Sequence, residues 1–121
     1  FVEDTAVLLG EHAIITRPGA GSRRTEADST ASALADRFTV HRIERGRIDG
    51  GDVLRIGKTI YVGQSQRTDC AGTVALANVA ARLGYEVVPV EVNACLHLKT
   101  AATYAGHDET GREVVLLNRD W

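Results

Sequence analysis

DGGDVLRIGKTIYVGQS at residues 49–65 decides the fold, because two β-rich runs flank a turn at Gly57 and Lys58. This arrangement is typical of a β-hairpin. Apolar residues on one helical face predict a helix over 69–83, which starts at an Asp N-cap and stops at a Gly. YEVVPVEV at 85–92 then reads as a strand. The predicted order of this unit is ββαβ.

The same order is expected on both sides of that unit. Residues 1–9 and 13–18 are β-rich runs joined by GEH, and TVHRI at 39–43 reads as a further strand. Between them, helical spacing on one face links Ala27, Ala31, Leu34 and Phe38. A third hairpin is predicted from 97–106 and 113–121, around the polar turn HDETG. The chain therefore reads as ββαβ, ββαβ and ββ.

Chemistry-bearing residues keep the period of these units. Asp4 and Asp52 stand 48 positions apart, as do Asp49 and His97. We expect an acid or a histidine at the start of the first strand of each unit. Regular self-similarity is typical of units placed around a common axis, as in propellers, and the strand starts would converge near that axis. The predicted repeats are roughly 1–48, 49–95 and an incomplete 96–121, in one partial domain. A plain α/β sandwich is the alternative.

Composition narrows the classes of function. The chain has 121 residues, 14 basic and 16 acidic, with a formal net charge of -2. The basic residues form no stripe, so nucleic acid is not an expected partner. No apolar run approaches the ~20 residues that span a bilayer, and no leader segment is visible. Cys70 and Cys95 lack metal-type or redox-type spacing. These features predict a cytoplasmic protein. Strand-like ends and the lack of methionine suggest a piece of a longer chain.

The acids at the strand starts indicate a ligand. Burying Glu3, Asp4, Asp49 and Asp52 together without a cation would be costly, so these side chains either face water or bind a cation. A cationic substrate is the natural partner if they converge.

Five motifs in order resemble those of the dimethylarginine dimethylaminohydrolase family: FVEDTAV (1–7), ITRPGAGSRR (15–24), DGGDVLRIG (49–57), YVGQSQRTD (61–69) and CLHLKTAAT (95–103). The resemblance implies an α/β fold that forms about half of a five-bladed propeller of ββαβ units. It also implies hydrolysis of a guanidino C–N bond. Dimethylarginine and monomethylarginine would yield citrulline and a methylamine through a cysteine that attacks the guanidinium carbon.

The resemblance assigns roles to six residues of this chain. His97 matches the general acid and base, and Asp49 matches the acid that orients it. Substrate binding falls to Glu3 and Asp4, which would grip the guanidinium, and to Arg23 and Arg67, which would clamp the α-carboxylate. The competing interpretations are a core histidine, solvated acids at strand edges and arginines in surface ion pairs.

The nucleophile is the point where the match breaks. In the family it lies near the C-terminus, beyond Trp121, so we expect the chain alone to be inactive. Cys95 lies two residues from His97, too far along a strand for a ready dyad. Cys70 is expected to be a small buried residue or a thiol without catalytic weight.

Alternatives remain for the reaction and for the partners. Arginine deiminases resemble this pattern but typically carry an aspartate where Lys99 stands, and a lysine cannot hold a cation. A non-catalytic binding module of the same propeller fold and a metal-dependent hydrolase that uses His97, Asp49 and Asp4 are the other candidates. The leading interpretation needs no cofactor and no metal. Its expected partners are a small methylated arginine, the remainder of a parent chain and a second copy in a homodimer.

Overall fold

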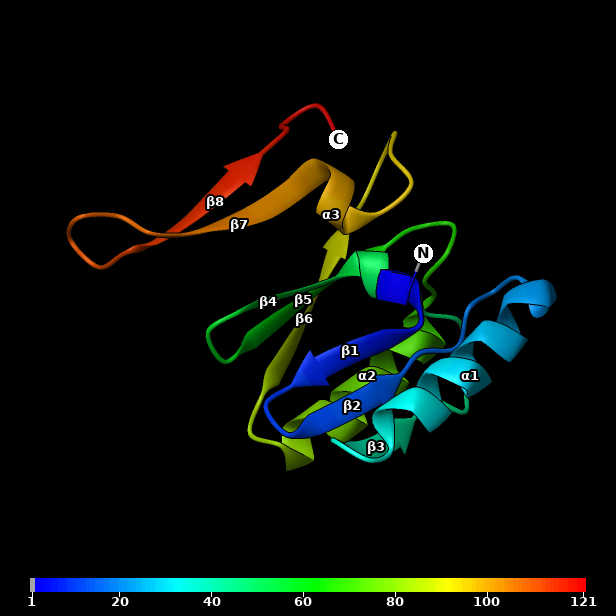
Figure 1. Cartoon of the computed structure of the whole chain (residues 1–121). Coiled ribbons are helices and arrows are strands. Elements are labelled where there is room, and N and C mark those ends of the chain that lie inside the picture. Colours follow the sequence, from blue (N-terminus) through cyan, green and yellow to red (C-terminus); the bar gives the residue numbers. More distant parts are fainter. Residues whose placement is uncertain (1) are drawn as a thin grey trace.

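A mixed three-stranded sheet opens the fold in the computed structural model, which describes residues 2–121 (Figure 1). It consists of β1 (Ala6–Leu9), β2 (His12–Ile15) and β3 (Thr39–Arg42). β1 pairs with β2 antiparallel, and β2 pairs with β3 in parallel. Parallel neighbours need a crossover, which α1 (Arg24–Leu34) supplies. The predicted hairpin, helix and strand are confirmed for this part of the chain.

The second sheet repeats this topology. It consists of β4 (Val53–Ile56), β5 (Thr59–Gln64) and β6 (Glu86–Glu91), with α2 (Cys70–Arg82) in the crossover. Asp69 is the N-cap of α2, as predicted, and its side chain accepts a hydrogen bond from the N–H of Gly72. The chain leaves the helix through Gly84, whose φ of 79° favours glycine.

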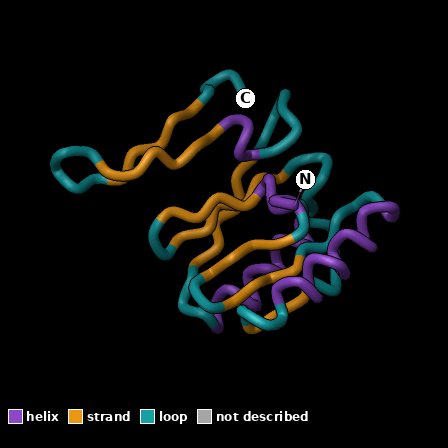
Figure 2. Tube along the Cα trace, viewed as in Figure 1, coloured by secondary structure: helices purple, strands orange, loops and turns teal. Residues whose placement is uncertain are grey.

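The third and last sheet has two strands. A single helical turn, α3 (Leu98–Ala101), leads into β7 (Ala102–His107), which pairs antiparallel with β8 (Glu113–Leu117). This hairpin extends away from the other two sheets (Figure 2). The predicted ββαβ, ββαβ, ββ order is therefore present in an α/β fold. None of the sheets among residues 2–121 closes on itself, so the propeller and its repeat boundaries stay predictions.

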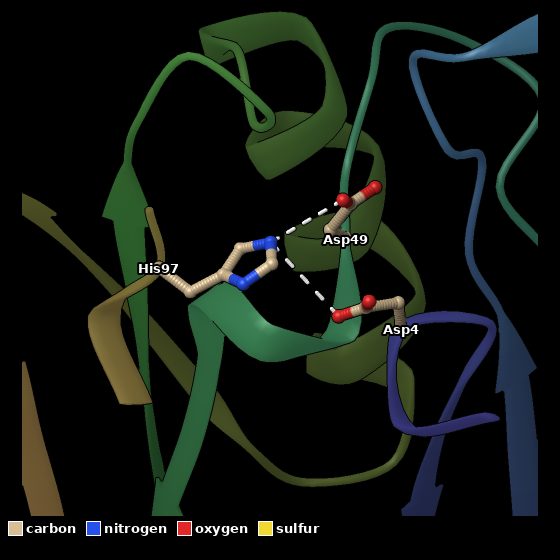
Figure 3. Close-up of side chains that lie close together, drawn as sticks. All are labelled: Asp4, Asp49 and His97. Atoms are coloured by element: carbon tan, nitrogen blue, oxygen red, sulfur yellow. Dashed lines mark hydrogen bonds and ion pairs between the residues drawn. The ribbon is translucent and has the colours of Figure 1, made fainter. Parts of the chain in front are cut away.

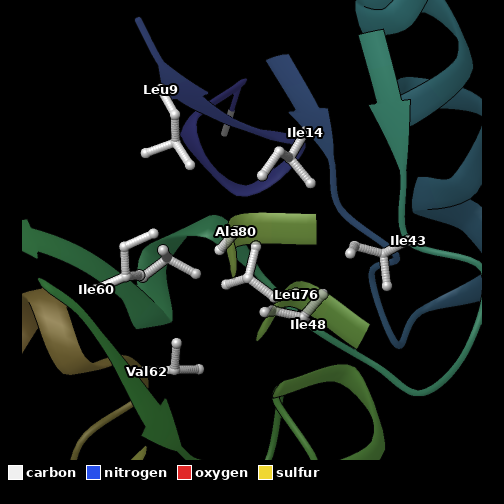
Figure 4. Packing of buried hydrophobic residues seen from close by; sticks show 9 residues of the cluster. Leu9, Ile14, Ile43, Ile48, Ile60, Val62, Leu76 and Ala80 are labelled. Atoms are coloured by element: carbon white, nitrogen blue, oxygen red, sulfur yellow. The ribbon is translucent and has the colours of Figure 1, made fainter. Parts of the chain in front are cut away.

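The main core lies where α2 is held between the first two sheets. Leu76 and Ala80 of α2 are buried and pack with residues of both sheets and of the loops that join them, namely Leu9, Ile14, Ile43, Ile48, Val53, Ile60 and Val62 (Figure 4). A smaller cluster joins the second sheet to α3 and the last hairpin through Leu54, Ile56, Leu98 and Ala102. These two clusters fix the beginnings of the three units relative to one another.

The beginnings of the units differ from the sequence-based expectation. Each first strand follows a single helical turn: η1 (Val2–Asp4), η3 (Gly50–Asp52) and α3. His97 precedes such a turn and is not at a strand start, so that prediction is wrong. Phe38 was expected on the helix face, but α1 ends at Leu34 and Phe38 lies beyond it. A regular strand would send successive side chains to opposite faces of the sheet, whereas a helical turn spreads them around its axis.

The helices of residues 2–121 all fall short of the length and apolar character that crossing a bilayer requires.

Candidate active site

His97 is the centre of a polar cluster that joins the beginnings of the three units. Its imidazole lies against the backbone of Gly51, where an added Cβ would come within 2.8 Å of the ring. His97 Nε2 is 3.3 Å from Asp49 Oδ2 and 3.9 Å from Asp4 Oδ1 (Figure 3). One ring nitrogen therefore faces two carboxylates that come from different units.

Asp49 is the buried partner of this histidine. Its side chain is 1% exposed, and its backbone leads into η3. Its N–H donates to Thr68 Oγ1 at 3.2 Å. Asp49 Oδ1 has no hydrogen-bond partner within the described part of the chain. A buried carboxylate beside an imidazole orients the ring and stabilises its protonated form.

Asp4 is fixed by its neighbours on both oxygens. Oδ1 accepts a hydrogen bond from the N–H of Gly51 at 3.1 Å, and Oδ2 accepts one from Arg23 Nη1 at 3.2 Å. Asp4 is thus held against the second unit from its place in the first.

The Arg23 guanidinium lies between these carboxylates. Arg23 ends η2 (Gly21–Arg23), and its Nη1 is also 3.8 Å from Asp49 Oδ2. Its Nε lies 3.4 Å from Glu26 Oε2. Burial acts to lower the pKa of Arg23, but the hydrogen bond and the charge of Asp4, with help from Glu26, raise the pKa above its ordinary value. The site therefore stabilises a guanidinium cation.

Glu3 points to a different partner from Asp4. Its carboxylate pairs with Lys99 Nζ at 2.8 Å, and its side chain is 59% exposed. The two neighbouring acids therefore face different partners among the described residues, and no sequence signal pointed to the pairing with Lys99, 96 positions from Glu3.

A cavity of about 470 Å³ opens over this cluster. It is lined by five of the six residues that the sequence assigns to the site: Glu3, Asp4, Arg23, Arg67 and His97. Asp49 lies behind them, out of contact with the cavity. Arg67 faces the same space, and its guanidinium makes no hydrogen bond or ion pair with residues 2–121. The structure thus gathers the predicted residues, while their catalytic and binding roles stay predictions.

A metal ion is the other ligand that this donor set could hold. Asp4, Asp49 and His97 each offer one atom within 4.8 Å of the others. The guanidinium of Arg23 already lies on both carboxylates, and its positive charge opposes a second cation there. Any cation that binds these carboxylates, whether a metal ion or a substrate guanidinium, would therefore have to displace Arg23.

Known proteins resemble this chain in sequence. A dimethylarginine dimethylaminohydrolase of Streptomyces coelicolor is 49% identical to the chain over 105 residues, which are 85% of this chain. Over this match the chain is similar to the dimethylarginine dimethylaminohydrolase family. The enzyme of that name from Pseudomonas aeruginosa is 35% identical over 112 residues. The chain spans 41% and 44% of the lengths of these two relatives. No family model matches the chain.

Solved structures of this dimethylarginine dimethylaminohydrolase family share the fold. A cysteine-to-serine mutant of the Pseudomonas aeruginosa protein, complexed with citrulline, superposes with a TM-score of 0.82 at 36% identity. The match covers 86% of this chain and 42% of that protein. An amidinotransferase from Microseira wollei superposes with a TM-score of 0.75 at 16% identity, which shows a likeness of fold alone.

Proposed function

We propose that this chain supplies the acid–base histidine and the substrate-binding residues of an enzyme that hydrolyses Nω-methylated arginines to citrulline and a methylamine. The relatives that carry the name of this activity are more than twice as long as the chain. The proposal therefore concerns the longer enzyme, to which these residues would contribute one part.

The position of the Arg23 guanidinium carries the proposal. A planar cation of the same chemical class as the substrate already lies on Asp4 and Asp49, beside His97 Nε2. Carboxylates that receive N–H groups in a fixed geometry hold the plane of a guanidinium and so select the face of attack. A substrate guanidinium would replace that of Arg23 on these oxygens and release Arg23 toward the substrate α-carboxylate.

The reaction assigns His97 two proton transfers. A cysteine thiolate adds to the guanidinium carbon, the C–N bond to the methylated nitrogen breaks, and His97 donates a proton to the leaving amine. His97 then takes a proton from water, whose oxygen adds to the same carbon. The C–S bond breaks, so citrulline is released and the thiolate returns. Asp49 keeps the ring oriented through both steps.

Neither cysteine of this chain is placed to attack. The Cys95 thiol lies 3.3 Å from the backbone oxygen of His97, to which it can donate, and not at the imidazole. Cys70 is exposed at the first position of α2, so the alternative that it is a small buried residue is wrong. The proposal therefore takes the nucleophile from a part of the enzyme other than residues 2–121.

Lys99 supports a methylated substrate over plain arginine. Its ammonium lines the cavity and neutralises Glu3, so the acid of the cavity that remains for a guanidinium is Asp4. An arginine deiminase-type site would need a further anion for the unmethylated end of the guanidinium. Arg67 remains available in the same cavity for the α-carboxylate.

A chimera tests the proposal directly. The 105 matched residues of the Streptomyces coelicolor enzyme are replaced by those of this chain, and citrulline release is measured with asymmetric dimethylarginine and with arginine. His97→Ala serves as the inactive control, and Asp36→Asn, at an exposed carboxylate in the turn after α1, as the neutral one. Release from the methylated substrate alone, lost with His97→Ala, is expected.

Other outcomes of that assay favour other functions. Citrulline formed mainly from arginine would assign a deiminase-type hydrolase. Failure of a folded chimera to release citrulline from either substrate would contradict the proposal and favour a binding module.

We also propose that this enzyme is cytoplasmic. A separate proposal is that the last hairpin is covered by another segment, either the remainder of a parent chain or a second copy. Leu116 and Leu117 of β8 are 62% and 65% exposed. Such apolar side chains and open sheet edges favour association. Light scattering of the isolated chain, with Leu116→Lys as comparison, would measure it. A monomer at all concentrations would contradict the homodimer.

A further inference from the structure

Asp52 is a fully buried carboxylate that the proposed mechanism does not use. It closes η3, three residues after Asp49, and its exposure is 0%. Burying an ionised group is costly unless its oxygens are satisfied. We propose that Asp52 is a positioning residue that fixes His97, Asp49 and Arg67 relative to one another.

Three donors converge on this carboxylate. Asp52 Oδ1 accepts a hydrogen bond from the N–H of Leu98 at 2.9 Å. Oδ2 accepts hydrogen bonds from Ser65 Oγ and Thr68 Oγ1, each at 2.6 Å. The short distances are typical of hydroxyl groups that donate to an ionised acceptor.

Each donor belongs to a segment that carries a residue of the site. The Leu98 amide is joined to His97, so its hydrogen bond fixes the backbone from which the imidazole projects. Thr68 Oγ1 accepts from the N–H of Asp49 at 3.2 Å, and Ser65 Oγ accepts from the N–H of Arg67 at 3.0 Å. One carboxylate therefore joins two segments, 65–68 and 97–98, to its own segment, 49–52.

The direction of these hydrogen bonds requires an acceptor at both oxygens. Each hydroxyl accepts from a backbone N–H and donates its own proton to Asp52, because an ionised carboxylate can only accept. An asparagine has the same shape, but its NH₂ group would face either the two hydroxyls or the Leu98 amide. Asp52→Asn therefore inverts the polarity at one of these contacts. Gly63 packs closely against this carboxylate, since an added Cβ would lie 2.9 Å from Asp52 Oδ1.

The first unit also ends its opening turn on an aspartate, Asp4, which stands 48 positions before Asp52 although the strands of the two units are offset by 47. Asp4 Oδ1 takes the N–H of Gly51 in the second unit, as Asp52 Oδ1 takes that of Leu98 in the third. The strands of the two units correspond at an offset of 47, which places Pro18 and Gly21 where the second unit has Ser65 and Thr68. Without hydroxyl donors, Asp4 Oδ2 is turned to Arg23. Asp4 therefore lines the cavity, whereas Asp52 binds the segments that carry the other site residues.

Nuclear magnetic resonance of the chain tests this role without any turnover. Because the ring of His97 lies on Gly51, a nuclear Overhauser effect is expected between Gly51 Hα and the imidazole protons. Asp52→Asn should abolish this effect and speed exchange of the Leu98 amide by at least about tenfold. Methyl contacts between Ile60 and Leu76 in the main core should persist, as they should in the control Asp36→Asn. An intact imidazole contact and unchanged exchange in folded Asp52→Asn would overturn the proposal.

Milder variants decide the matter if Asp52→Asn does not fold. Thr68→Val should speed exchange of the Asp49 amide and weaken the imidazole contact, whereas Thr68→Ser, which keeps the hydroxyl, should restore both. Equal behaviour of the valine and serine variants would overturn the proposal. The catalytic meaning of Asp52 rests on the proposed function, but this readout does not. A chimera that releases no citrulline would contradict the proposed function. A His97 ring that stays ordered without Asp52 would contradict the positioning role instead.

Discussion

Asp69 fastens the start of α2 to the loop that leads into Asp49, and its removal has a calculable cost. Its Oδ1 accepts hydrogen bonds from the N–H groups of Gly72 at 2.8 Å and Arg47 at 2.9 Å, and its Oδ2 pairs with Arg47 Nε at 3.2 Å. Loss of an N-cap costs about 1 kcal/mol. The second backbone hydrogen bond adds about 1 kcal/mol more. The ion pair adds less than about 1 kcal/mol, because the carboxylate is 35% exposed and screened by solvent.

Asp69→Ala is therefore expected to lower the free energy of unfolding by roughly 2 to 3 kcal/mol at pH 7. Arg47→Ala, which keeps both backbone hydrogen bonds, should cost less than about 1 kcal/mol. Urea unfolding followed by circular dichroism measures both. The reasoning is refuted if the two variants lose the same stability, because the ion pair would then account for the whole effect.

The pH dependence of this contribution has a definite sign. Burial alone would raise the pKa of Asp69, but the N–H groups of Arg47 and Gly72 and the Arg47 guanidinium lower this pKa below its ordinary value of 3.8. A carboxylate whose pKa is lower in the folded than in the unfolded state contributes its full stabilisation at any pH above the unfolded-state pKa. This stabilisation is lost as the pH falls through the folded-state pKa. The difference between wild type and Asp69→Ala should thus be constant above about pH 5 and shrink below about pH 4. A difference that grows in acid would contradict this assignment.

Three further substitutions have expected outcomes. Leu76→Ala empties the main core between two sheets and should cost about 2 to 5 kcal/mol in urea unfolding, while Val74→Ala, at an exposed position of the same helix, should cost much less. Gly72→Ala would normally favour a helix, but the new Cβ would lie 2.1 Å from the Arg47 carbonyl oxygen, so a lowered melting temperature is expected and a raised one would contradict this contact. Asp108 accepts hydrogen bonds from Thr110 and Arg112, which lower its pKa to about 2, so the amide shifts of these two residues should titrate near pH 2 and be insensitive to pH in Asp108→Asn.

Local signals account for the part of the fold that the sequence predicted. Asp69 before α2 and Gly84 after it are chemical boundaries of a helix, and the turn at Gly57 has a φ of 57° that glycine adopts readily. The end of α1 lacks such a boundary. Apolar spacing alone extended the expected helix to Phe38, whereas the structure ends it at Leu34. Periodicity predicts a face but does not fix where a helix stops.

The site was predictable in its members and not in its connections. His97 and Asp49 meet at 3.3 Å, as the resemblance implied. The hydroxyls of Ser65 and Thr68 gave no signal, because serine and threonine in a turn usually bond to nearby backbone. Their contact with Asp52 depends on two segments being folded together first.

The pair of acids at residues 3 and 4 shows why adjacency in sequence is a poor guide to a binding site. Successive residues of a 3₁₀ turn project about 120° apart, so the two carboxylates of η1 point to different sides. Glu3 accordingly turns outward to Lys99, and Asp4 turns inward to Arg23. The second carboxylate on that guanidinium comes instead from Asp49, 45 positions along the chain and at the beginning of the next unit. A guanidinium site in this fold is thus made between units, and its geometry depends on whatever holds their beginnings in register.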